Sequence, residues 1–253
     1  MKKLISITFF LAVFNLSAQT LEKHEPNIIW LGMKTGYSQS KLSGLDEWTI
    51  SEGLTSAFDK SNSHTLLGFD LMYELGRIPI GLNSTFHFSG QNNPLSFLID
   101  ITLQSGYTII KKGKMNLKAL GGIGFGYARL DINGVPSSFQ SFAENYASPY
   151  PRLSFLNLSP SLMYSYSPHG QPKTVTEGKS HFYTVFYFQA GLNHFFNHSW
   201  KYGAAANDIN EENSFSGTPV SMPTLLKNNF FITVGIAFAM QVNSSNWKNK
   251  IAK

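Results

Sequence analysis

The chain has 253 residues, no cysteine and a formal net charge of +5 at pH 7, which falls to +3 if Lys2 and Lys3 leave with a leader peptide. The lack of cysteine excludes disulfides, thiolate metal sites and an acylated lipoprotein cysteine, and the scattered basic residues argue against nucleic-acid binding. Aromatic and charged residues each make up 14% of the chain. Because soluble proteins usually carry about 25% charged residues, this composition favours a surface that lies largely in lipid.

The first residues read as a secretory signal peptide. Met1-Lys2-Lys3 is a charged start, Leu4–Phe14 is an apolar core, and Leu16-Ser17-Ala18 offers a small-residue cleavage site. We therefore predict a signal peptide over residues 1–18 and one domain over residues 19–253. No apolar run of about 18 residues follows the leader, which excludes a spanning helix.

The mature chain alternates apolar and polar residues with a period of two, which predicts β-strands. The predicted strands, in chain order, are residues 27–38, 64–75, 78–89, 95–110, 115–130, 154–167, 180–196 and 229–242. Pro160 removes a backbone donor from the sixth strand, so we expect a β-bulge there. The register of the seventh strand is ambiguous because both of its faces carry aromatic residues.

Long strands with one apolar face are typical of membrane-spanning barrels. The fold class predicted is all-β: an eight-stranded antiparallel up-and-down transmembrane β-barrel. Long connections over residues 39–63, 133–153 and 197–228 alternate, imperfectly, with short turns, and outer-membrane barrels place such long loops outside the cell. A ten-stranded barrel remains an alternative if a long loop hides a hairpin.

Five charged residues within the predicted strands fall on the face opposite the apolar one: Lys34, Asp70, Glu74, Asp100 and Lys118. A charge that faces lipid at mid-depth costs about 2–4 kcal/mol, so this face should line the lumen. Side chains just fill the interior of an eight-stranded barrel. The three acids and two bases therefore predict a paired charge network in the lumen.

The signal peptide ending in LSAQT, the strands, and the segments YELG, QSGYTIIKKGK and GGIGFGY together resemble outer-membrane β-barrel proteins of the Bacteroidota type. The architecture is also similar to that of small OmpA- and OmpX-like barrels. The resemblance implies the outer membrane of a Gram-negative cell as location. It also implies outer-membrane lipid, lipopolysaccharide and the barrel assembly machinery as partners.

Few motifs suggest chemistry. The glycines of residues 121–126 lie inside a strand and lack the following helix of a dinucleotide site, so no cofactor or metal is expected. His194, His198 and Ser199 are candidate catalytic residues, because small barrels that trim lipid A use a His and a Ser at the outer end of a strand. However, Phe196 stands where the deacylase signature has its serine, and adjacent His198 and Ser199 should point to opposite faces.

The leading functional prediction is a structural or interaction barrel that presents extracellular loops, with no catalytic activity expected. The first alternative is a lipid A-modifying, deacylase-like enzyme. The second is a narrow channel for small or hydrophobic solutes. The sequence does not specify an extracellular partner.

Overall fold

The computed structural model describes residues 27–42, 45–53, 62–89, 95–130, 150–170, 181–203, 218–220 and 226–242. The predicted signal peptide lies outside these residues. The elements of the described part are β1 (Asn27–Leu42), α2 (Leu45–Ser51), β2 (Asn62–Leu75), β3 (Ile78–Ser89), β4 (Leu95–Lys112), β5 (Met115–Leu130), β6 (Tyr150–Leu158), β7 (Ser161–Tyr166), β8 (His181–Gly203), β9 (Thr218–Val220) and β10 (Leu226–Val242).

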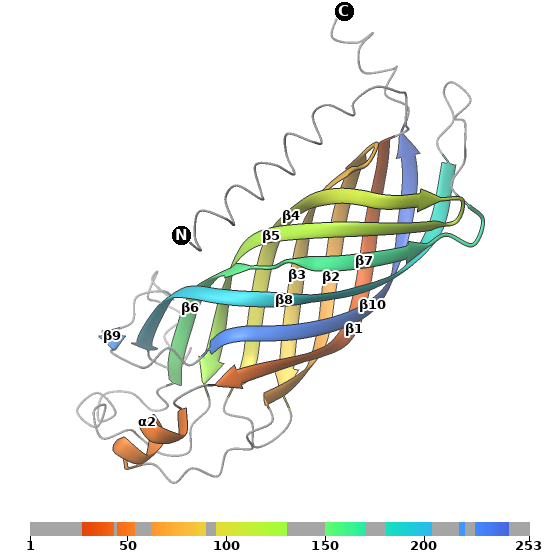
Figure 1. Cartoon of the computed structure of the whole chain (residues 1–253). Coiled ribbons are helices and arrows are strands. Elements are labelled where there is room, and N and C mark those ends of the chain that lie inside the picture. The colour runs from red at the N-terminus through yellow and green to blue at the C-terminus, as the bar shows by residue number, and fades with distance from the viewer. Residues whose placement is uncertain are drawn as a thin grey trace, which may run out of the picture.

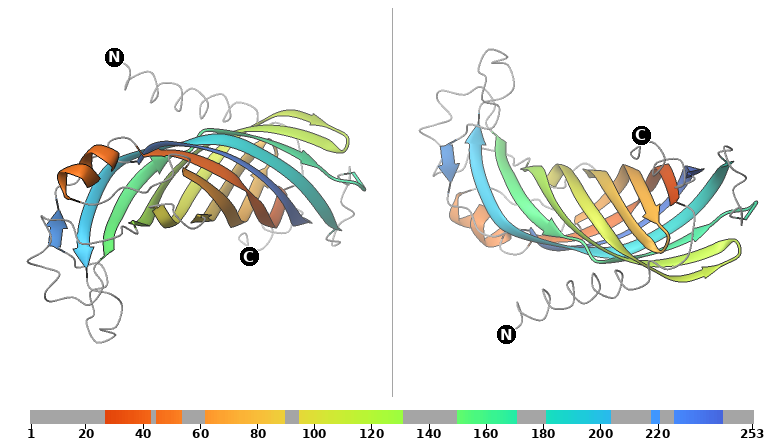
Figure 2. Two further views of the ribbon diagram at one scale, coloured as in Figure 1. Left: turned by 90° about the horizontal axis from the view of Figure 1, so that it is seen from below. Right: turned by 90° about the horizontal axis from the view of Figure 1, so that it is seen from above.

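The strands close into a barrel. Each of β1 to β5 pairs antiparallel with the next strand, β6 and β7 both lie between β5 and β8, and β10 pairs with β8 and with β1. Because β6 and β7 are successive segments of one wall strand, the ring has eight strands, which confirms the predicted eight-stranded barrel (Figures 1 and 2). The short β9 pairs with β8 and lies off the ring.

The wall strand is interrupted at Ser159 and Pro160, where the sequence predicts a bulge. The register across the interruption is unchanged, with Leu158 and Ser161 opposite residues 194 and 191 of β8. Ser159 exchanges two backbone hydrogen bonds with Gly122, and the Pro160 carbonyl accepts one from Leu192. The proline therefore removes one donor without adding a residue, and the predicted bulge is wrong. A register shift lies nearby instead, between Ser154 and Leu156.

Two tight turns join β2 to β3 and β4 to β5. Gly76 and Gly113 both have a φ of 60°, a left-handed backbone that costs little for glycine. Both turns lie at one end of the barrel, and α2 and β9 lie at the other (Figure 1). The structure thus has a short-turn end and a long-connection end.

The strands extend further into the predicted long loops than the apolar alternation indicates. Strand β1 continues to Leu42 and β2 begins at Asn62, with α2 between them, so the loop predicted over 39–63 is shorter than expected. Likewise β6 begins at Tyr150, and β8 continues to Gly203, while β10 begins at Leu226. These extensions shorten the loops predicted over 133–153 and 197–228. Beyond a lipid-facing band, a strand needs no apolar alternation, so sequence periodicity underestimates its length.

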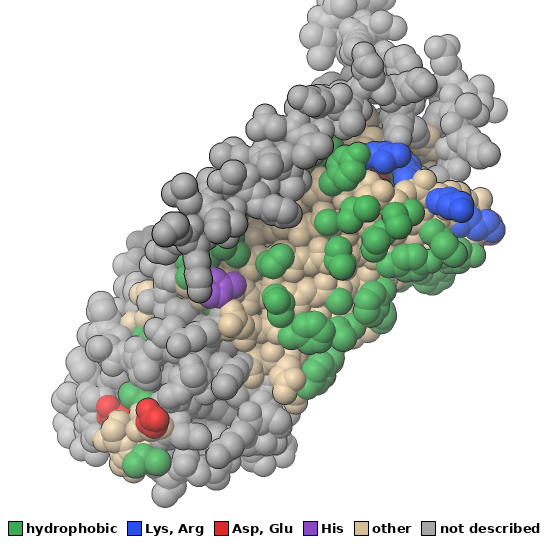
Figure 3. All heavy atoms as spheres, in the orientation of Figure 1, with side chains coloured by type: hydrophobic (Ala, Val, Ile, Leu, Met, Phe, Trp, Pro, Cys, Tyr) green, Lys and Arg blue, Asp and Glu red, His purple; other side chains and the backbone are tan. Residues whose placement is uncertain are grey.

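The outer wall is apolar. Large hydrophobic side chains point outward from every wall strand, among them Leu31, Leu71, Leu103, Ile123 and Phe125. Hydrophobic side chains are spread over the visible wall, and basic side chains gather at the short-turn end (Figure 3). Within the part of the chain that the structure describes, no helix is long and apolar enough to cross a membrane.

Candidate functional site in the barrel lumen

The lumen is filled by side chains that alternate with the outward apolar ones. Near the short-turn end, Glu74, Lys118 and Trp30 form what we call the Glu74 cluster. Lys118 forms a buried ion pair with Glu74, whose Oε1 also accepts a hydrogen bond from Trp30 Nε1 at 3.0 Å. The ammonium of Lys118 lies 4.8 Å from the centre of the Trp30 ring, a cation–π contact. Both charges of the pair are therefore satisfied inside the barrel.

A second group, the Asp70 cluster, lies next along the axis. Asp70 accepts a hydrogen bond from Lys34 Nζ at 3.1 Å and another from Tyr187 Oη at 2.6 Å. The rings of Tyr187 and Trp30 meet edge to face, with centroids 5.2 Å apart. This contact joins the Asp70 cluster to the Glu74 cluster across the lumen.

The Tyr187 ring occupies this place because two strands carry glycine against it. A Cβ atom built at Gly235 would lie 2.5 Å from the Tyr187 hydroxyl oxygen, and one at Gly32 would lie 2.9 Å from it. Any larger residue at either position would displace the ring from Asp70. Glycines on the inward face of these strands therefore leave the space that the large Tyr187 side chain fills inside the lumen.

A third group, the His87 cluster, lies toward the long-connection end. His87 Nε2 lies 2.8 Å from Asp100 Oδ2, and His87 Nδ1 lies 3.2 Å from Ser38 Oγ. Ser38 and His87 are fully buried, and Asp100 nearly so. The three residues come from β1, β3 and β4, so barrel closure and strand register bring them together.

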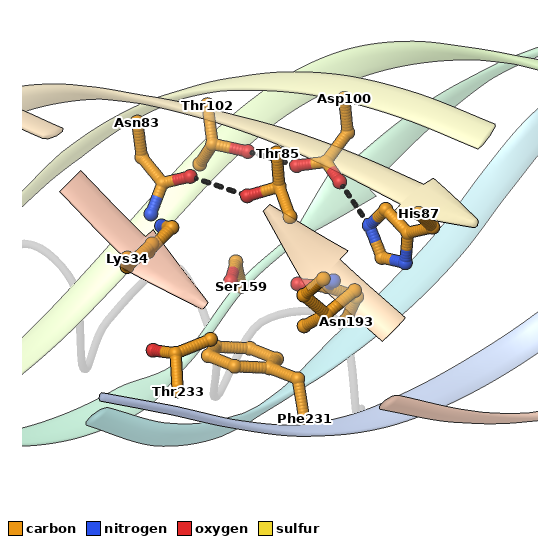
Figure 4. Close-up of a pocket in the computed structure, with 11 residues that line it drawn as sticks. Lys34, Asn83, Thr85, His87, Asp100, Thr102, Ser159, Asn193, Phe231 and Thr233 are labelled. Carbon is orange, nitrogen blue, oxygen red and sulfur yellow. Dashed lines mark hydrogen bonds and ion pairs between the residues drawn. The ribbon is translucent and has the colours of Figure 1, made fainter. Parts of the chain in front are cut away.

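A small cavity of about 10 Å³ adjoins the His87 cluster (Figure 4), which is room for about one water molecule. Its lining is mostly polar and includes Lys34, His87, Asp100, Thr102 and Asn193. Toward the short-turn end, the described lumen residues pack as an apolar core around the Glu74 cluster. That core consists of Ile28, Trp30, Met72, Leu120, Met163, Val185, Tyr187, Ala237 and Ala239.

The structure places all five predicted charged residues inside the lumen, where each has a partner of opposite charge or a histidine. Lys34 pairs with Asp70, Lys118 pairs with Glu74, and Asp100 pairs with His87. Sequence reasoning did not anticipate the roles of His87, Tyr187 or Trp30. Tyr187 and Asp70 meet across the lumen although they lie 117 positions apart in the sequence. The alternation along a strand therefore indicates which side of the wall a residue faces, but not its partner.

The structure does not bring the candidate catalytic residues His194 and Ser199 together. His194 points outward, where its Nδ1 lies 2.7 Å from Asn228 Oδ1 and its ring stacks on Phe196. Ser199 lies five residues further along β8, which is about 16 Å of extended strand. The His198 side chain lies outside the described residues. In the described part of the chain, no group of three or more histidine or acidic residues is arranged to hold a metal ion.

Comparison with known protein families identifies the family to which this barrel belongs. The family described as "Outer membrane protein beta-barrel domain" matches residues 8–238. The chain belongs to this family. It is an outer-membrane β-barrel protein, and its apolar outer band is therefore the lipid-facing surface.

Several solved structures align with most of this chain at low sequence identity. Neisserial surface protein A is 9% identical with a TM-score of 0.47, covering 83% of this chain and 95% of that one. OprG from Pseudomonas aeruginosa is 14% identical with a TM-score of 0.31, covering 88% and 99%. The protease OmpT from Escherichia coli is 10% identical with a TM-score of 0.33, covering 88% and 100%. No curated protein matches the sequence.

Proposed function

We propose that this protein is a structural or interaction barrel, closed to solutes, that acts through the segments at its long-connection end. The observation that carries this proposal is the occupied lumen. The Glu74 and Asp70 clusters cross the interior and are joined by the contact between Trp30 and Tyr187. A barrel plugged by paired charges and aromatic rings gives solutes no continuous path.

The orientation follows from the unequal ends. Barrels of the outer membrane place short turns in the periplasm and longer connections outside. In this orientation, α2 and β9 face the cell exterior, and the tight turns at Gly76 and Gly113 face the periplasm. Exposed Arg77, Lys112 and Lys114 lie at the periplasmic end, and loops positioned by a rigid scaffold are common places for binding.

The partners that we propose are the lipids and the assembly proteins of the outer membrane. Outer-membrane lipid, including lipopolysaccharide, contacts the apolar wall, and the barrel assembly machinery inserts the chain. The extracellular surface would then bind a macromolecule rather than pass a solute. The lipid A-modifying alternative gains no support from His194, because its hydrogen-bond partner is an amide on the outer wall.

Planar-bilayer recording tests the proposal. The mature chain, refolded in detergent and verified by its heat-dependent gel shift, is expected to give no conductance steps above the protein-free bilayer. A Trp30→Ala/Tyr187→Ala variant is the matched control, since it removes two large rings from the lumen and should conduct. Reproducible steps from the unaltered protein would contradict a closed barrel and favour the channel alternative.

A further inference from the structure

Exposed basic side chains gather around the two tight turns at the short-turn end (Figure 3). Lys112 and Lys114 flank Gly113 in the turn from β4 to β5, and Arg77 lies in the turn from β2 to β3. The two turns adjoin, because the backbone N–H of Thr108 donates a hydrogen bond to the Arg77 carbonyl at 2.8 Å. We call Arg77, Lys112 and Lys114 the basic rim.

The charge of the basic rim is not balanced by carboxylates at that surface. The acidic side chains that the structure describes are either paired inside the lumen or lie in or beside α2 at the opposite end: Asp70, Glu74, Asp100, Glu47 and Glu52. Neither Lys112 nor Lys114 forms an ion pair with a described residue. Two ammonium groups therefore leave positive charge available to an anion at this end of the barrel.

The basic rim borders directly on the apolar wall. A register shift between Thr108 and Ile110 accompanies outward exposure of both Ile109 and Ile110, each 50% exposed. Lys112 follows Ile110 by two residues and stands opposite Met115, which is 49% exposed. Two residues of a tilted strand rise about 5 Å, and the headgroup layer beside the hydrocarbon core is about 5–7 Å thick. With Ile110 at the edge of the core, Lys112 lies at the level of the lipid phosphates.

Tyrosines on the neighbouring strand β7 indicate the same depth. Tyr166 stands opposite Met115 in the register of β5 and β7, and Tyr164, on the same face, is 39% exposed. Tyrosine is enriched at membrane–water interfaces, where its amphipathic ring sits at headgroup level. The Lys114 carbonyl accepts a backbone hydrogen bond from Ser167 at 2.9 Å. Lys114 therefore lies just beyond these rings, on the side away from the hydrocarbon core.

We propose that the basic rim binds the phosphate groups of anionic phospholipids in the leaflet at the short-turn end. One lipid matches both parts of this surface, because its acyl chains cover Ile110 and Met115 while its phosphate faces Lys112 and Lys114. Each lysine near an anionic membrane surface strengthens such binding by about fivefold. The inference rests on the lipid contact proposed above and names its lipid class. It does not depend on a closed lumen, so the conductance experiment and the one below can fail separately.

Native mass spectrometry of the refolded barrel tests the proposal with equal amounts of dioleoylphosphatidylglycerol and dioleoylphosphatidylethanolamine. The two lipids have the same acyl chains, but only phosphatidylglycerol has a net negative charge. We expect the barrel to retain phosphatidylglycerol about 10-fold more than phosphatidylethanolamine. Lys112→Gln/Lys114→Gln should lower this ratio to about 2-fold or less, whereas Lys112→Arg/Lys114→Arg should keep it. The heat-dependent gel shift verifies that each variant is folded.

A relocated charge separates a binding site from an effect of net charge. Lys112→Gln/Lys114→Gln/Glu47→Lys has the net charge of the unaltered protein, but its new lysine lies on α2 at the opposite end. It should behave like the double variant. Equal retention of both lipids by the unaltered protein, an unchanged ratio in the double variant, or a ratio restored by Glu47→Lys would overturn the proposal. Lysine-dependent binding to peptidoglycan without a preference between the lipids would also overturn it, in favour of the cell wall.

Discussion

Replacing Lys118 with methionine is expected to destabilise the folded barrel by about 3–5 kcal/mol, the usual cost of removing one partner from a buried ion pair. The side chain of Lys118 is 1% exposed, and that of Glu74 is 5% exposed. Methionine fills a similar volume but leaves the Glu74 carboxylate with the Trp30 N–H and no cation. Urea-dependent unfolding in phospholipid vesicles, followed by tryptophan fluorescence, measures the loss.

Two control variants identify the cause. In Lys118→Met/Glu74→Gln the buried charge is gone and Gln can still accept from Trp30, so most of the lost stability should return. Lys112→Met removes an exposed lysine at the end of β4 and should change the stability by no more than about 0.5 kcal/mol. A double variant as unstable as Lys118→Met would show that the pair is not the reason for the loss.

Placing arginine at position 123 is expected to cost about 2–4 kcal/mol of barrel stability, because the guanidinium would face the middle of the bilayer. Ile123 lies at the centre of β5 and is 53% exposed on the outer wall. Exposed apolar residues of a soluble protein would tolerate this change, so the cost arises from the lipid. The same vesicle unfolding experiment measures it.

The matched control lies on the same face of the same strand. Met115 begins β5 at the short-turn end, is 49% exposed, and should lie at the membrane interface. Met115→Arg should therefore cost only about 0–1 kcal/mol. Equal losses at positions 115 and 123 would be incompatible with a depth-dependent lipid environment on this wall.

The alternation of apolar and polar residues was sufficient to predict the ring of eight strands and whether most side chains face the lumen or the outside. The alternation along β5, for example, places Lys118 inside and Ile123 outside, as the structure does. This works because lipid and lumen impose opposite chemical demands on successive residues. The same reasoning underestimates strand ends, such as β8 to Gly203, because no lipid faces a strand beyond the membrane.

The contacts across the lumen were not predictable in the same way. Tyr187 lies on a strand whose two faces both carry aromatics, so its inward direction became clear only from the pairing of β8 with β10. His87 stands on the polar face of β3, but its contact with Ser38 joins residues 49 positions apart. A sequence signal for the His87 cluster is that His87 and Asp100 both lie on the inward face of neighbouring strands.

A crystal structure of the barrel at a resolution that shows ordered water would test the closed lumen most directly. We expect density for Lys118 within hydrogen-bonding distance of Glu74, and an edge-to-face contact between Trp30 and Tyr187. Ordered water should be confined to the neighbourhood of the small cavity beside His87. A continuous column of water running between the two ends of the barrel would contradict the closed lumen and the function proposed from it.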